Sequence, residues 1–541
     1  MPFGLQGWDL RRSLSCRQKG TRSVSVRACR PKRSGRAKSA RSPRRRRVRI
    51  GKPDPALTAS AGVVAVTELD RVLGLVRSLD EYLPGFKERD RGLTGGQTLT
   101  AIASCQLAGG DHLVSLDRRR ADVAGQELEP VPTPASTTVA GLAKRFTDEM
   151  FTGIETAIAA VNARTLGLVG QVRASALTRQ VTLDIDATDI EVYGPTKAGA
   201  AYNYQGQRAY RADIVLWAEL GVPLAADLLA GDDDPRSSVV ALIERTHANL
   251  ISALPDLATG TSSGNTSSGN RSGKVALRMD AGYFAADAAI AADGLGIEFA
   301  IGVKRNQAVW RAAAAVPDHQ YVPVIGMDHT EVAVIPYAPK GWPKQIVCLA
   351  RRTRIRADQV SRDPRARKRR TIPKDQLALA LDGHLDHVYG YSFILTNKTV
   401  HAPHGTPDDR TLDTVDPDTV DAELLAEVEH WYRHRTDIEA LNKDGKHGAA
   451  LRHMPSADKT VNRVWMWAAL LATAVSAWIQ ELSGIDRGNG RGRRTIARLR
   501  RELINIPARV IHPGRTTVLR PPPGPNLLRV VLPRLQALPT G

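Results

Sequence analysis

Residues 181–188 have the sequence VTLDIDAT, in which apolar and polar side chains alternate. Successive side chains of a strand point to opposite faces, so the branched apolar residues share one face and Asp184 and Asp186 share the other. The stretch is therefore expected to be a half-buried strand that ends at Asp186 and carries both aspartates on one face.

The segments after this strand continue an α/β pattern. Alternation and turn residues predict strands at 213–220, 223–229, 274–280 and 298–305, and helices at 237–253 and 284–292. The order is three strands, a helix, a strand, a helix and a strand. It is typical of an RNase H-like α/β domain, in which helices flank a mixed sheet.

The rest of the chain is expected to be arranged around this core. Three- and four-residue spacings predict an all-helical N-terminal domain, for which DNA-end binding, plain packing and dimerisation remain equally open. Strands at 330–337, 345–350 and 389–395 indicate a β-rich insertion, and Pro521–Gly524 is expected to end the regular structure. The expected parts are a basic disordered tail at 1–52, the helical domain at 53–170, the first part of the catalytic core at 171–305, the insertion at 306–420, the final core helices at 421–485 and a C-terminal extension at 486–541.

Composition excludes several classes of protein. The net charge is +20, but residues 1–52 carry 18 Lys or Arg and one acid, which leaves about +3 for all the rest. The tail is either a nonspecific DNA-binding arm or a solvated extension, so net charge does not establish a nucleic-acid partner. The four cysteines form no close pair, which argues against a zinc module or a disulfide framework. The apolar run 464–479 is too short to span a membrane, and no secretory leader is visible, so we expect a buried helix and a cytoplasmic, nucleoid-associated protein.

Two aspartates are candidates for phosphodiester chemistry. Such chemistry needs carboxylates that converge on divalent ions from different elements. Asp186 and Asp280 each follow an expected strand, and Gly282 allows a tight turn beside the second carboxylate. Asp184 is a direct rival of Asp186, and a surface or helix-capping role is an ordinary alternative for either candidate.

The third candidate stretch is more specific. Tyr432, Arg435, Glu439 and Lys446 are separated by three, four and seven residues, so on one continuous helix from about 421 to 442 and beyond they share a face. The ordinary alternative is a solvated helix with an Arg435–Glu439 surface pair. Asp444-Gly445 disfavours helix just before Lys446, which leaves the place of that lysine on the common face open.

These residues resemble the DDE transposases of bacterial insertion sequences, in the group with a β-rich insertion. Tyr432-x2-Arg435-x3-Glu439-x6-Lys446 is similar to the signature of that group, and the blocks at 186–188 and 280–283 are similar to its two aspartate blocks. The stretch at 201–208 also looks like a subgroup hallmark. The resemblance implies that Asp186, Asp280 and Glu439 bind Mg²⁺, with Mn²⁺ as the alternative, and that Tyr432, Arg435 and Lys446 contact transposon-end DNA.

The expected function is therefore that of a transposase. It would cut double-stranded DNA at the terminal inverted repeats of its element and join the ends to target DNA, as a homodimer and without a small-molecule cofactor. Two alternatives remain open: an RNase H-like nuclease that cuts but does not join, and a nonenzymatic DNA-binding protein such as a decayed transposase. Neither membrane association nor a membrane partner is expected.

Overall fold

The computed structural model describes residues 48–87, 91–258, 275–401, 420–485 and 492–541. The chain forms two compact units, Met1–Pro53 and Asp54–Gly541. Only 48–53 of the first unit are described, and they form neither helix nor strand. Most of the basic tail, with two of the cysteines, and the Gly/Ser/Asn tract at 259–273 lie outside the described residues.

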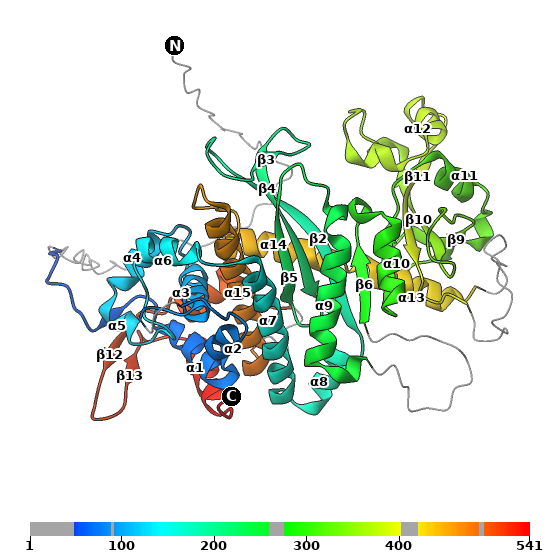
Figure 1. The fold of residues 1–541 in the computed structure, drawn as a ribbon. Coiled ribbons are helices and arrows are strands. Elements are labelled where there is room, and N and C mark those ends of the chain that lie inside the picture. Colours follow the sequence, from blue (N-terminus) through cyan, green and yellow to red (C-terminus); the bar gives the residue numbers. More distant parts are fainter. Residues whose placement is uncertain (1–47, 88–90, 259–274, 402–419, 486–491) are drawn as a thin grey trace, which may run out of the picture. The chain divides into compact units, whose positions relative to one another are not determined.

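One mixed sheet of ten strands forms the centre of the described part of the second unit (Figure 1). Its order is β3-β4-β2-β6-β7-β11-β10-β9-β8, and β5 also pairs with β4. The pairs β2–β4 and β4–β5 are antiparallel, whereas β2–β6 and β6–β7 are parallel. The strands are β2 Val181–Glu191, β3 Ala201–Tyr202, β4 Arg208–Trp217, β5 Val222–Ala230, β6 Val275–Met279, β7 Glu298–Gly302, β8 Val322–Pro323, β9 Thr330–Ile335, β10 Val347–Arg356 and β11 His387–Thr396.

Strand β2 confirms the predicted faces and corrects its predicted length and burial. Its branched residues belong to the large apolar core, while Asp184 and Asp186 lie on the other face and contact residues of β6 and the helix at 436–448. The strand does not end at Asp186 but continues to Glu191 through its pairing with β4. Residues 181–185 are buried on both faces, because helices cover both sides of the sheet there.

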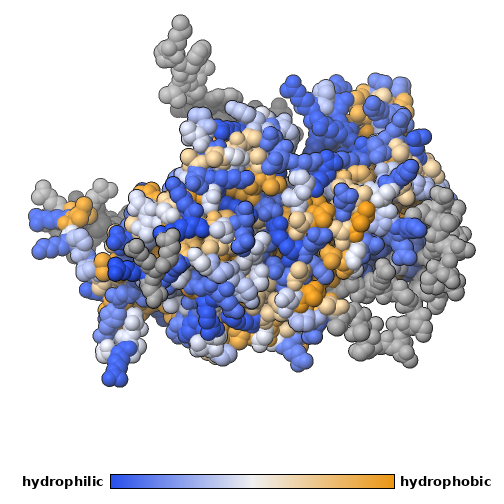
Figure 2. All heavy atoms as spheres, viewed as in Figure 1, coloured by the Kyte–Doolittle hydropathy of each residue, from blue (hydrophilic) through white to orange (hydrophobic). Residues whose placement is uncertain are grey.

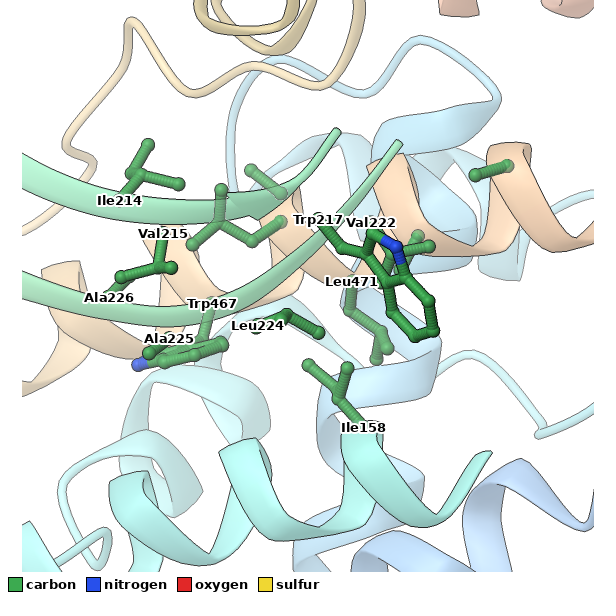
Figure 3. Close-up of a cluster of buried hydrophobic side chains, with 14 of the residues drawn as sticks. Ile158, Ile214, Val215, Trp217, Val222, Leu224, Ala225, Ala226, Trp467 and Leu471 are labelled. Carbon is green, nitrogen blue, oxygen red and sulfur yellow. The ribbon is translucent and has the colours of Figure 1, made fainter. Parts of the chain in front are cut away.

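The predicted order of strands and helices after β2 is confirmed. Helix α9 (Val239–Ala253) follows β5, and α10 (Ala286–Gly294) lies between β6 and β7. Helices α7 (Asp148–Leu168), α9 and α15 (Lys459–Ser483) pack against β5. Figure 3 shows Ile158 of α7 and Trp467 and Leu471 of α15 against the apolar side chains of β4 and β5.

Helix α15 confirms the prediction of a buried helix rather than a membrane span. Asp458 caps its first turn by accepting from the backbone N–H groups of Thr460 and Val461, and Gly484, at φ 61°, ends it in the left-handed conformation. Trp465 and Trp467 are both fully buried. Among the described residues, no helix is long and apolar enough to cross a membrane.

The N-terminal part of the second unit consists mainly of helices. Its helices share one continuous apolar core with the sheet and with α15. Besides α7, they are α1 Val64–Leu73, α2 Leu75–Glu81, α3 Gly95–Leu107, α4 Ser115–Arg120, α5 Val123–Gln126, α6 Ser136–Ala143 and α8 Gln171–Thr178.

The interval after β7 contains the predicted strands, but they extend the central sheet. Thr396 of β11 pairs with Ala300 of β7, and β10, β9 and β8 follow outward. Strand β10 runs on to Arg356, and helices α11 (Gln307–Ala314) and α12 (Lys374–Leu381) complete the interval. In the view of Figure 2, hydrophilic side chains gather over the region beside α12.

The prediction that Pro521–Gly524 ends the regular structure is wrong. Helix α17 (Leu528–Gln536) follows and packs against α1 and α15, where Val531 and Leu535 are fully buried. Before it come α16 (Ile496–Leu499) and a three-stranded sheet of β1 (Leu57–Thr58), β12 (Ala508–Ile511) and β13 (Val518–Arg520). The two ends of this unit therefore meet in one small sheet.

Candidate active site

The predicted continuous helix is broken in two, which corrects the spacing argument for its four polar residues. Helix α13 spans Ala422–Arg433 and α14 spans Thr436–Gly448, with a turn at 434–435 between them. Tyr432 therefore belongs to α13, whereas Glu439 and Lys446 belong to α14. Asp444-Gly445 does not end α14, so Lys446 stays on the helix that carries Glu439.

Tertiary contacts at the end of α13 account for this break. The Tyr432 hydroxyl donates to the Met279 carbonyl at 3.1 Å, and the Arg278 guanidinium donates to the Trp431 carbonyl. Arg278 and Met279 are the last two residues of β6 and directly precede Asp280. The end of α13 is thus fixed to the strand that carries the second candidate carboxylate.

Asp184 and Asp186 differ in their partners, because Arg278 pairs with Asp184. Asp184 is fully buried and accepts from Arg278 Nε at 2.6 Å and from Nη2 at 2.8 Å. Burial raises the pKa of Asp184 to about 6, and the facing guanidinium opposes that rise. Asp184 is therefore the partner of a buried cation and not a free ligand.

Asp186 lies in a different environment two residues further along β2. It accepts from Asn442 Nδ2 at 3.1 Å, and the Asn442 Oδ1 atom is buried without a hydrogen-bond partner among the described residues. Burial raises the pKa of Asp186 to about 7; Arg435 opposes the rise, and the negative charges of Asp280 and Glu439 add to it. Its carboxylate charge is thus only partly compensated within the protein.

Asp280 follows β6 and begins a short 3-10 turn at Ala281–Tyr283. Its carboxylate accepts from the Gly282 N–H at 2.7 Å, so the capping role considered as the alternative is present. The Tyr283 hydroxyl donates to Asp213 on β4 at 3.0 Å, which fixes the far end of the turn. Asp280 and Asp186 line one open cleft of about 1160 Å³.

Glu439 is the most exposed of the three candidate carboxylates. Its side chain is 56% exposed and accepts from Arg435 Nη2 at 3.0 Å, which is the i,i+4 pair considered as the alternative. The guanidinium of Arg435 is largely buried, and Nη1 has no hydrogen-bond partner among the described residues. The charges of Asp186, Asp280 and Glu439 all raise the pKa of Arg435 against the effect of burial. The charges of all three carboxylates thus act on Arg435, and Glu439 is in direct contact with it.

Lys446 lines the cleft together with Asp186 and Asp280. Its ammonium donates to the backbone carbonyl of Asp189 at 2.7 Å, and burial lowers its pKa. Burial also raises the pKa of Tyr432 to about 12, with its hydroxyl engaged inside the protein by Met279.

The donor set fits a hard divalent cation in its chemistry. Carboxylate oxygens are the ligands that Mg²⁺ and Mn²⁺ prefer, and a cation beside Asp186 would offset the burial and the like charges that raise its pKa. In the described part of the chain, no three His, Cys, Asp or Glu side chains stand close enough together to hold a metal ion. Glu439 is held by Arg435 instead.

Sequence reasoning did not single out Asn442, Arg278, Asp189 or Gly302. Asn442 follows Glu439 by three residues on α14, a spacing that places it on the same face. Arg278 is a lone charge within the buried strand VALRM, a pattern that indicates a buried partner. A Cβ at Gly302 of β7 would lie 2.8 Å from the Tyr432 hydroxyl and from the Ala281 nitrogen.

A comparison with known protein families shows the family of the chain. The family model described as transposase DDE domain group 1 matches residues 41–362, more than half of the chain, and the chain belongs to this family. The matched region contains Asp186 and Asp280 but ends before Glu439. Because the match covers more than half of the chain, the protein is a DDE-domain protein of the transposase class.

Other comparisons add little. No curated protein matches the chain. A cryo-EM structure of piggyBac transposase in a synaptic complex with hairpin DNA is similar at 9% identity, over 82% of this chain and 79% of that chain, with a TM-score of 0.33. A likeness of this size carries no inference about the present chain.

Proposed function

We propose that the protein is a transposase that cuts DNA at the terminal inverted repeats of an insertion sequence and joins the ends to target DNA. The observation that carries the proposal is that Asp186 and Asp280 line one open cleft, while Arg435, paired with Glu439 at 3.0 Å, has its pKa raised by the charges of all three carboxylates. The strand order β5-β4-β2-β6-β7, with three antiparallel strands followed by two parallel ones, supports an RNase H-like core at 171–305 and 421–485.

The three carboxylates would hold Mg²⁺ or Mn²⁺, with Glu439 released from Arg435. Divalent ions in such a site neutralise phosphate charge and activate the attacking oxygen. Each step, hydrolysis by water and attack by a freed 3′-hydroxyl, is an in-line displacement at phosphorus. One site can therefore serve both.

The cationic side chains of the site would position the DNA. Arg435 has an unpaired buried donor, and a guanidinium binds phosphate oxygens in a bidentate manner. Lys446 supplies a second positive charge on the same helix. The Tyr432 hydroxyl holds α13 on β6, so its contribution to DNA contact would come through its ring or through the position of Arg435.

The test is a combined cutting and joining assay with the full-length protein. Labelled duplexes that carry the element's own inverted repeats are incubated with Mg²⁺ and a target plasmid, and both nicked ends and joined products are measured. Joined products in Mg²⁺ and none in EDTA would support a transposase. Cutting without joining would favour a nuclease, and Asp280→Asn and Glu439→Gln variants as active as the unmodified protein would favour a nonenzymatic or unrelated activity. To test for a homodimer, equal amounts of two differently tagged copies are mixed with the DNA. Recovery of both tags in one active complex would show that the complex contains more than one copy.

A further inference from the structure

The exposed aromatic side chains of the described residues are confined to one segment of the chain. Tyr193, Tyr202 and Tyr204 are 80%, 69% and 85% exposed, and every other described aromatic side chain is at least partly buried. All three lie between β2 and β4, in the segment that contains the short strand β3. This end of the sheet extends beyond the helices that cover it (Figure 1).

Two of these tyrosines belong to the candidate active site. Tyr193 and Tyr204 line the same cleft as Asp186 and Asp280, whereas Tyr202 is not among its lining residues. Gln205 and Gln207 line the cleft beside them, and Gln205 Nε2 donates to the Tyr204 hydroxyl at 3.0 Å. Two exposed rings and two amide side chains therefore line the cleft that Asp186 and Asp280 also line.

The turn that carries Tyr204 is rigidly built. The Asn203 side chain is buried and accepts from the backbone N–H groups of Gln205 and Gln207. Gly206 adopts a φ of 76°, which the turn requires. Ring faces held out by such a turn lose little conformational entropy when they bind a ligand.

The same turn is tied to the catalytic elements through Asp189. Its carboxylate accepts from Asn203 Nδ2 and from Arg211 Nε, each at 2.9 Å, and its carbonyl accepts from Lys446. Asp189 follows Asp186 by three residues on β2. The turn, α14 and the first candidate carboxylate thus form one connected framework.

The cleft beside the rings is lined by charges of both signs. Its cations are Lys197, Arg211, Arg236, Lys304, Lys446 and Arg452, and its carboxylates are Asp186, Asp189, Glu191, Asp234 and Asp280. Arg211, Arg236 and Arg452 form ion pairs with Asp189, Asp234 and Asp111, which leaves the three lysines as the cations of the described lining that can bind phosphate without breaking an ion pair. Phosphate groups bound by these lysines would bring their bases next to the tyrosine rings. A base within a duplex has both faces covered by its neighbours, so only an unpaired base can stack on an exposed ring.

We propose that Tyr193 and Tyr204 form a stacking site for unpaired nucleobases of the DNA strand that enters the carboxylate cleft. The inference rests on the proposed function, because it takes the cleft to be the place of DNA cleavage. Gln205 and Gln207 contact the edges of the same bases. Tyr202 takes no part.

The test measures binding of the full-length protein to two probes at one fixed salt concentration. The probes are a fluorescein-labelled mixed-sequence single strand of about 20 nucleotides, longer than one stacking groove occupies, and the corresponding duplex. The double variant Tyr193→Ala/Tyr204→Ala is expected to bind the single strand at least about tenfold more weakly, since each stacked base contributes roughly a five- to hundredfold factor. Duplex affinity is expected to change by less than about twofold, as phosphate contacts dominate it.

Matched variants separate stacking from a general loss of structure. Tyr193→Phe/Tyr204→Phe keeps the rings and should bind the single strand like the unmodified protein, and so should Tyr202→Ala. Unchanged single-strand affinity in the Ala double variant, or an equal loss in Tyr202→Ala, would overturn the inference. Metal-dependent cleavage by the unmodified protein is measured in parallel. If that cleavage is absent, the proposed function fails; if it is present while the Ala double variant binds normally, only the stacking site fails.

Discussion

The two halves of strand β2 carry two aspartates on the same face, one with a structural role and one that is a candidate metal ligand. Residues 181–185 are buried throughout, and Asp184 there meets the Arg278 guanidinium in a two-point ion pair. From Asp186 onward the strand lines the cleft. Asp186 accepts a hydrogen bond from an amide donor, and the charge of Arg435 opposes the two like charges that raise its pKa. Both aspartates lie on the same face. The partner, and not the strand or its face, distinguishes them.

The largest expected effect comes from the buried half of the strand. Asp184→Asn leaves the Arg278 charge buried without its counter-ion, which should lower the free energy of unfolding by about 3–5 kcal/mol. Urea denaturation followed by circular dichroism measures this. A loss of less than about 1 kcal/mol would mean that the pair does not hold the core together.

The cleft half should instead respond to pH. The folded-state pKa of Asp186 is raised from 3.8 to about 7, so the folded protein holds this proton more tightly than the unfolded chain does. Its contribution to stability is full below about pH 4 and is lost as the pH rises through 7. Asp186→Asn removes that loss, so the variant should match the unmodified protein at pH 4 and exceed it by about 4 kcal/mol at most at pH 8.

The measurement is urea denaturation of both proteins at several pH values in EDTA. Glu155 and Asp213 also have pKa values raised to about 7 by burial, but they are common to both proteins, so the difference isolates Asp186. A difference that does not vary with pH would show that Asp186 is not desolvated.

A smaller effect on the free energy of unfolding is expected at Gly302, where close packing rather than charge is disturbed. Gly302→Ala would place a methyl group against the Tyr432 hydroxyl and the start of the Asp280 turn. Such overpacking should cost about 1–3 kcal/mol of unfolding free energy and reduce DNA cleavage. Gly294→Ala is the matched control, because a Cβ there meets nothing within 4 Å. Equal behaviour of the two variants would contradict the close contact.

The smallest effect on stability is expected at Glu439. The Arg435–Glu439 pair is half-exposed on the carboxylate side, so Glu439→Gln should change the free energy of unfolding by less than about 0.5 kcal/mol. The same variant should lose cleavage activity. A large loss of stability would assign Glu439 a structural role like that of Asp184.

The sequence allowed the prediction of what depends on local pattern. Alternation placed the two aspartates of β2 on one face, and the order of strands and helices through β7 followed from periodicity and turns. The spacing of Glu439 and Lys446 needed only α14 to continue to Gly448, as it does.

Contacts between distant residues decided the rest. Asp184 and Asp186 could not be told apart because Arg278 lies 94 residues from Asp184. The break between α13 and α14 contains neither Pro nor Gly and depends on contacts of Trp431 and Tyr432 with β6. The insertion strands join the central sheet through the β11–β7 pair, a link that no local pattern contains.

Metal-dependent strand cleavage by Asp186→Asn, compared with Asp232→Asn, tests the central claim most directly. Asp232 is an exposed residue that does not line the cleft, so its variant controls for the loss of one surface charge. With Mg²⁺ and a duplex that carries the element ends, Asp186→Asn should remain folded but cleave more than about 100-fold more slowly. Loss of a residue that only supports a metal ligand costs up to about 100-fold, and loss of a ligand itself should cost more. Asp232→Asn should cleave like the unmodified protein. Cleavage by folded Asp186→Asn at the unmodified rate would contradict the assignment of this carboxylate to the active site.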